Sequence, residues 1–339
     1  KFFERDSDGR KLSKGQQEYF KDSKVRDEDG NLLSDEVTEQ RKLGVKLTGN
    51  VDVTGGTSVG GLYATNLLAI DQLSAVWSVK ATGTDDATGV SGATVAIKDF
   101  SGSMKVATEG AGTATAIRMN SGTIDGFTGS IEVESGGDGY GIRATSYGTR
   151  TITGSAGSIK VVASGAAYGI SEYYSESSYY GRTSSLTVDG MGTDLEVTSS
   201  ASSAYGISLY TAATSSYSSM YGSAVNQLTT GDVTGHITVS GEADAYGIYS
   251  YAQGYYGYYS NGTSKTVSTM SVGKISSDIA VTGGDNAYGI YNVASPVSTS
   301  YGAGTAGVEL DELAGHLTVS AGTGVAYGIY SSGDVSGGK

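Results

Sequence analysis

A short motif returns nine times along this chain of 339 residues and constrains the fold more than any other feature. Its full form is Ala245-Tyr246-Gly247-Ile248-Tyr249. Six copies keep Tyr-Gly-Ile, and three eroded copies end in Leu62, Val90 and Ile117. Successive copies lie 25 to 28 residues apart in the first half and 37 to 42 apart in the second. Repetition at such periods indicates a repeat architecture.

Each repeat holds three short segments in which apolar residues alternate with polar ones. An apolar-x-Val pair, such as Ile237 and Val239, begins eleven to thirteen residues before the last residue of the motif. A further apolar residue usually stands four residues before this pair, as Val233 does, and another five residues before that, as Leu228 does. Alternation over a few residues, broken by Gly, Ser, Asp or Thr, is typical of strands with one buried face. The only tryptophan, Trp77, aligns with Ile237 and is therefore expected to fill the core.

Three strands in every repeat predict an all-β fold, a right-handed, three-sided parallel β-solenoid of about nine coils over residues 47–332. Residues 1–46 form a separate charged segment, and residues 333–339 are expected to be a flexible tail. We expect the last residue of the motif to stack as an inward core row. The isoleucines of this row are Ile142, Ile170, Ile207, Ile248, Ile290 and Ile329.

Tyrosine is the residue type in excess, with 25 copies. Strand alternation predicts that Tyr246 shares the inward face with Ile248, and that Tyr249, Tyr291 and Tyr330 stack outside as a ladder. The longer repeats carry Tyr- and Ser-rich insertions that leave the coil at one corner. Their tyrosines either pack on one another or form a contact surface. The candidates for that surface are Tyr173, Tyr174, Tyr179, Tyr180, Tyr255, Tyr256, Tyr258 and Tyr259.

The N-terminal segment differs from the repeats in charge. Residues 1–46 hold 11 basic and 11 acidic residues, so the repeats carry the whole net charge of −13. An acidic solenoid repels phosphate, and nucleic acid is not an expected partner. The segment could form two hairpins around a short helix, and could cap or dock on another coil. Asp-Gly turns at Asp8-Gly9 and Asp29-Gly30 fit hairpins better than calcium loops, which need Gly and Glu at other positions.

No motif in the sequence carries catalytic, cofactor-binding or metal-binding chemistry, so neither an enzyme nor a cofactor is expected. His236 and His316 take outward positions two coils apart, too far for a shared site. The chain has no cysteine and no run of 18 apolar residues, which excludes disulfides and predicts no membrane span. Carboxylates lie isolated along the repeats, for example Glu132, Asp194 and Asp278.

Two stretches resemble known families. The "AYGIY" and "GxIxV" repeats of residues 47–330 resemble passenger regions of bacterial autotransporters, and "LSKGQQEYFKDSKVRDEDGNLL", residues 12–33, resembles a leader segment of phage and mobile-element proteins that carry toxins. The first resemblance implies a solenoid exported to the bacterial surface. The second implies only an exchangeable leader piece.

We therefore expect a non-enzymatic, extracellular structural or adhesive protein of a bacterial surface. It would be either a passenger rod or a fibre subunit that stacks head to tail, with residues 1–46 docking on the coil of Tyr327–Tyr330. Surface glycans or proteins are further possible partners. The alternatives are a polysaccharide-active β-helix enzyme and a receptor-binding protein similar to phage tail spikes.

Overall fold

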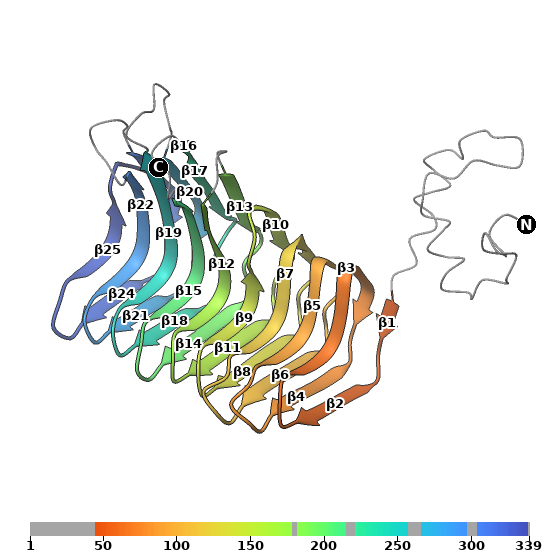
Figure 1. Cartoon of the computed structure of the whole chain (residues 1–339). Helices are drawn as coiled ribbons and strands as arrows, with labels where there is room; N and C mark the ends of the chain where they lie inside the picture. The colour runs from red at the N-terminus through yellow and green to blue at the C-terminus, as the bar shows by residue number, and fades with distance from the viewer. Residues whose placement is uncertain (1–44, 178–181, 215–220, 257–265, 297–303, 338–339) are drawn as a thin grey trace, which may run out of the picture.

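The computed structural model describes residues 45–177, 182–214, 221–256, 266–296 and 304–337. These residues are all-β and wind into a parallel β-solenoid whose nine coils stack along one axis (Figure 1). The strands of the three faces pair in parallel from coil to coil, as the repeats predict. The hairpins and helix expected in the N-terminal segment fall outside the described residues.

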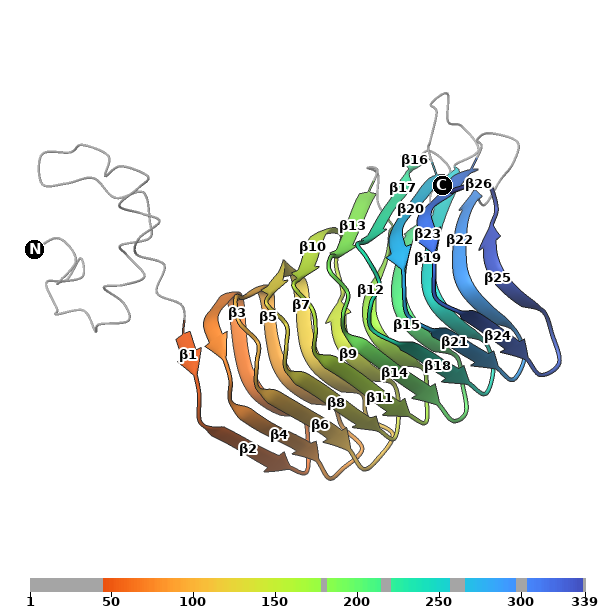
Figure 2. The ribbon, with the colours of Figure 1, turned by 180° about the vertical axis from the view of Figure 1, so that it is seen from behind.

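The three strand segments of each coil build three faces, which Figure 2 shows from behind. The first face is β2 (Asn50–Gly55), β4 (Val76–Ala81), β6 (Ser103–Thr108), β8 (Ser130–Ser135), β11 (Ser158–Ala163), β14 (Asp194–Ser199), β18 (Ile237–Gly241), β21 (Ile279–Gly283) and β24 (Leu317–Ala321). The second face holds the tyrosine motif: β3 (Val59–Leu73), β5 (Ala87–Ile97), β7 (Ala114–Asp125), β9 (Gly139–Ala144), β12 (Ala167–Ser177), β15 (Ala204–Thr214), β19 (Ala245–Tyr256), β22 (Ala287–Pro296) and β25 (Ala326–Ser331).

The third face is β1 (Val45–Leu47), β10 (Gly148–Thr153), β13 (Arg182–Val188), β17 (Ala224–Thr230), β20 (Thr266–Ile275), β23 (Gly304–Leu313) and β26 (Asp334–Gly337). In the early coils the long strands β3, β5 and β7 continue into this face, which joins the second and third faces into one sheet. A two-residue strand, β16 (Tyr221–Gly222), pairs antiparallel with β19.

Equivalent residues of successive coils stack in register and fill the interior. On the first face Val51 pairs with Trp77 and Trp77 with Met104, and Ile237 pairs with Ile279. Trp77 is 3% exposed, which confirms that it fills the core. The predicted isoleucine row is confirmed as well: five of its members are buried, and Ile329 packs partly buried against the same core. Burial of such rows is the main favourable term in the stability of a solenoid.

The inward placement predicted for Tyr246 is wrong, and a glycine is the reason. The ladder between β19 and β22 pairs Tyr246 with Tyr288 and Ile248 with Ile290 but skips Gly247. A Cβ on Gly247 would lie 3.2 Å from methyl groups of Ile279 and Val281 and 2.5 Å from the carbonyl oxygen of Gly289. Gly247 and Ile248 therefore both face the core, and the alternation of the strand is interrupted at this position. Tyr246 points outward although Ile248 points inward.

The insertions of the later repeats are partly strand rather than loop. The insertions lengthen the second-face strands β12, β15, β19 and β22 and the third-face strands β13, β17, β20 and β23. A second small core of Ala213, Ala224 and Ala252 lies between these two groups of strands.

Next to this small core lies a fully buried polar network. Asn292 Nδ2 donates to the carbonyl oxygens of Ser268 and Gly307, at 2.9 and 2.8 Å. Ser268 Oγ donates to Asn292 Oδ1 at 2.6 Å and lies 2.8 Å from Ser250 Oγ. The network therefore ties the second face to the third where the coils widen.

The tail expected at residues 333–339 also differs from the prediction. Asp334–Gly337 forms β26 and pairs in parallel with β23, with Val335 opposite Val308. Val335 continues the row of Leu228, Met270 and Val308. A strand with a single apolar residue offers no alternation to detect, so the sequence pattern missed it.

Candidate functional site

Tyrosine rings stack in three columns on the outer side of the second face. The first column is Tyr140, Tyr168, Tyr205, Tyr246, Tyr288 and Tyr327, with neighbouring ring centres 4.7 to 5.8 Å apart. The second column is Tyr249, Tyr291 and Tyr330, at 5.3 and 5.2 Å. The third column is Tyr173, Tyr210 and Tyr251, at 4.8 and 5.6 Å. The register of the coils, one strand spacing apart, sets these distances.

The first and second columns interlock edge to face. The ring centres of Tyr246 and Tyr249 lie 4.9 Å apart at 70°, and those of Tyr288 and Tyr291 lie 4.8 Å apart at 70°. Offset stacks and edge-to-face contacts are the favoured aromatic geometries. The structure therefore places the predicted ladder of Tyr249, Tyr291 and Tyr330 outside, but joins it to a column that the sequence assigned to the interior.

Burial keeps Tyr246, Tyr249 and Tyr291 uncharged in neutral solution. Burial raises the pKa of Tyr246 and Tyr249 above the usual tyrosine range, and it raises the pKa of Tyr291 to about 12. The Tyr246 hydroxyl donates to Asp244 Oδ2 at 3.4 Å. The face therefore presents neutral rings with hydroxyl groups, on a chain that is acidic overall.

The tyrosines of the insertions divide into three groups. Tyr173 is 50% exposed and belongs to the third column, as a contact residue should. Tyr174 is buried and meets Tyr147 edge to face, so it cannot belong to an exposed surface. Tyr255 and Tyr256 lie in β19, where Tyr256 pairs with Tyr221, but their side chains are outside the described part. Tyr179, Tyr180, Tyr258 and Tyr259 also lie outside it.

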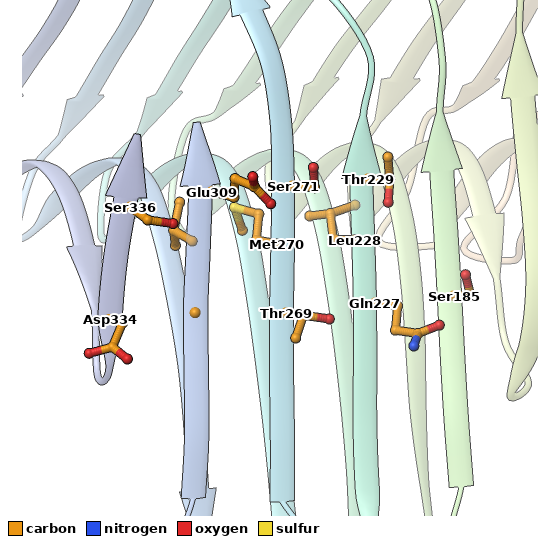
Figure 3. A pocket seen from close by; sticks show the side chains of 12 residues that line it. Ser185, Gln227, Leu228, Thr229, Thr269, Met270, Ser271, Glu309, Asp334 and Ser336 are labelled. Carbon is orange, nitrogen blue, oxygen red and sulfur yellow. The ribbon is translucent and has the colours of Figure 1, made fainter. Parts of the chain in front are cut away.

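A polar groove of about 440 Å³ crosses the third face (Figure 3). Side chains of neighbouring strands line it, among them Gln227 of β17, Thr269 of β20, Glu309 of β23 and Asp334 of β26. Hydroxyl, amide and carboxylate groups line it together with Leu228, Met270 and Val308, and none of the lining residues is aromatic. The groove lacks the flat apolar surface that the tyrosine columns provide.

A buried ion pair lies in a coil that lacks an apolar residue at the position of Leu186. Arg150 takes the row position of Leu186, with which it pairs in register, and is 2% exposed. Its Nη1 donates to Glu172 Oε1 at 2.6 Å, and its Nη2 donates to the carbonyl oxygens of Asn120 and Ser146. Burial raises the pKa of the Glu172 carboxyl to about 7, against the lowering effect of Arg150. The only signal in the sequence was the missing apolar residue in this coil.

Charges on the outer surface form pairs between neighbouring coils. Lys160 Nζ lies 2.8 Å from Glu196, and Lys274 Nζ lies 3.0 Å from Glu312. His316 is 86% exposed by its side chain and contacts Asp278 at 3.0 Å, so its predicted outward position is confirmed. Among the residues that the structure describes, no three His, Asp or Glu side chains gather as metal ligands would. The same residues include no helix with the length and apolarity to cross a membrane.

Comparisons with known proteins found no matching family model, no matching curated protein and no matching solved structure.

Proposed function

We infer that the chain is a non-enzymatic, extracellular adhesive rod of a bacterial surface, which makes contact through its tyrosine face. The observation that carries this proposal is the set of three tyrosine columns, which form a wide and rigid outer surface. Tyrosine offers a large amphipathic contact area and loses little rotamer entropy on binding. Rings already held by stacking lose even less. The resemblance of the repeats to autotransporter passengers supports the location.

The arrangement of charges favours this proposal over a polysaccharide-active enzyme. Such an enzyme needs two carboxyl groups on either side of one bond, within roughly 5 to 10 Å. Glu132 and Glu134 come that close, since both contact Lys105 Nζ, at 3.1 and 2.9 Å. The hydrogen bond from Lys105 lowers the pKa of Glu134, whereas a general acid needs a raised pKa. Glu196 and Glu312 are exposed, and each is paired with a lysine of a neighbouring coil. These pairs serve solubility and coil register, and each contributes at most about 1 kcal/mol.

Binding to cells tests the proposal. The purified chain is immobilised on beads and offered to a set of bacterial and animal cells, next to a variant with Tyr173→Ser, Tyr210→Ser and Tyr251→Ser. We expect the wild type to retain at least one cell type and the triple variant to lose most of that retention. Tyr63→Ser is the matched control, because Tyr63 is 72% exposed and its partner in the next coil is Ser91 rather than a ring. Equal retention by wild type and triple variant would contradict the proposal, as would release of reducing ends from a polysaccharide panel.

A further inference from the structure

The second tyrosine column stops short and leaves a notch in the ring surface. In β19 the residue of this column is Tyr249. Tyr249 pairs in register with Ser208 of β15, and Ser208 pairs with Ser171 of β12. Two serines therefore stand where two rings would continue the stack. The first and third columns run on at both sides of this gap. The resulting hollow has a volume of about 250 Å³.

Aromatic rings wall the notch on three sides. Tyr168 and Tyr205 of the first column line one side, and Tyr173 and Tyr210 of the third column line the other. Tyr249 closes the end. One face of the Tyr249 ring stacks on Tyr291 at 5.3 Å, and toward Ser208 the column holds no further ring. The notch thus ends at the Tyr249 ring, which Tyr205 of the notch wall meets edge to face at 5.3 Å.

Serine hydroxyls form the floor. Ser171 and Ser208 are each 3% exposed, and both line the notch. Each serine hydroxyl can donate one hydrogen bond and accept others. A ligand hydroxyl that reached the floor would find both a donor and an acceptor there.

We propose that this notch binds one pyranose ring of a glycan. The C–H face of the sugar would lie on the Tyr249 ring, whose negative π face attracts C–H groups. Sugar hydroxyls would exchange hydrogen bonds with Ser171 and Ser208. The volume is below the roughly 300 to 1,000 Å³ of pockets for drug-sized ligands, which suits a single ring. The inference rests on the proposed adhesive function and names what the tyrosine face recognises.

The other ligand that aromatic cages favour is a quaternary ammonium ion. A free carboxylate at the notch would strengthen that reading, and Glu172 is the one carboxylate among the lining residues. Its side chain is fully buried and pairs with Arg150 at 2.6 Å, so its charge is already matched. The serine hydroxyls of the floor fit a polyol better than a cation without hydrogen-bond donors.

Saturation-transfer NMR with methyl glycosides of mannose, galactose, glucose and N-acetylglucosamine tests the site. At least one glycoside should receive saturation at its ring C–H protons, with a dissociation constant of about 1 mM, as expected for so small a ligand. Ser208→Tyr adds the missing ring and should weaken binding at least about tenfold. Ser208→Ala should weaken it about threefold to tenfold without added bulk. Ser91→Tyr is the matched control, because Ser91 takes the same column position, next to Tyr63, outside the notch.

Several results would overturn the inference. These are no saturation transfer to any glycoside, binding unchanged in both Ser208 variants, or binding of tetramethylammonium with none of the glycosides. One outcome separates the two proposals in favour of adhesion: the wild type retains cells, the triple tyrosine variant does not, and both Ser208 variants still do. The sugar site is then wrong and the adhesive function stands. If glycosides bind at the notch but no cell is retained, the site stands and the adhesive function fails.

Discussion

At the scale of single residues, the glycine of the repeated motif decides which way the tyrosines point. Gly247 faces the core next to Ile248, which interrupts the alternation and leaves Tyr246 pointing outward. We predict that Gly247→Ala lowers the free energy of unfolding by about 2 kcal/mol, because the added Cβ would overlap the backbone of the next coil. Gly307→Ala is the control, since nothing lies within 4 Å of a Cβ at that strand position. Equal denaturant midpoints for the two variants would contradict the close approach of the next coil at Gly247.

A second residue-scale prediction concerns the buried Glu172. Its folded-state pKa is raised from 4.5 to about 7, so the folded chain holds a proton that the unfolded chain has released. The contribution of Glu172 to stability is therefore full below pH 4.5 and is lost as the pH rises to about 7, a loss of about 3 kcal/mol. Denaturation of wild type and Glu172→Gln between pH 4 and about 8 measures it. The two stabilities should converge or cross as the pH rises, and a constant difference would show that Glu172 does not titrate in this range.

At the scale of elements, the polar network holds the widened coils together. Asn292 makes three hydrogen bonds that join β22 to β20 and β23, and its side chain is fully buried. We predict that Asn292→Ala costs about 1 to 3 kcal/mol, because it leaves buried oxygens without donors. Asn50→Ala, at an exposed position of β2, is the control. Protection from hydrogen exchange should fall in β20, β22 and β23 and stay unchanged in β2 to β9; an even loss along the whole solenoid would argue against a local role.

At the scale of the whole molecule, self-association through the N-terminal segment stays a prediction. Residues 1–46 are neutral and the solenoid carries the net charge of −13, so solenoids repel one another side by side. A neutral arm that docks end to end avoids that repulsion. We expect light scattering to show polymers of the full chain at moderate salt and a monomer after removal of residues 1–44. Polymers that persist in the truncated chain would exclude the arm as the joint.

Sequence periodicity alone determined the solenoid, its nine coils and its core rows. Apolar rows can be read from the sequence because each coil repeats the same burial at the same offset. Ile248 and Trp77 therefore fall where their alignment predicts. The outward ladder of Tyr249, Tyr291 and Tyr330 follows from the same rule.

Only the tertiary structure decided what depends on contacts between coils. At Gly247 two successive residues face the core, which interrupts the alternation, so the sequence assigned Tyr246 to the wrong face. The pair of Arg150 and Glu172 joins two faces of the solenoid, and no spacing within one strand reveals it. The notch exists because two serines fall beside each other in a column of rings. A single strand carries only one of them, and the stacking of coils brings them together.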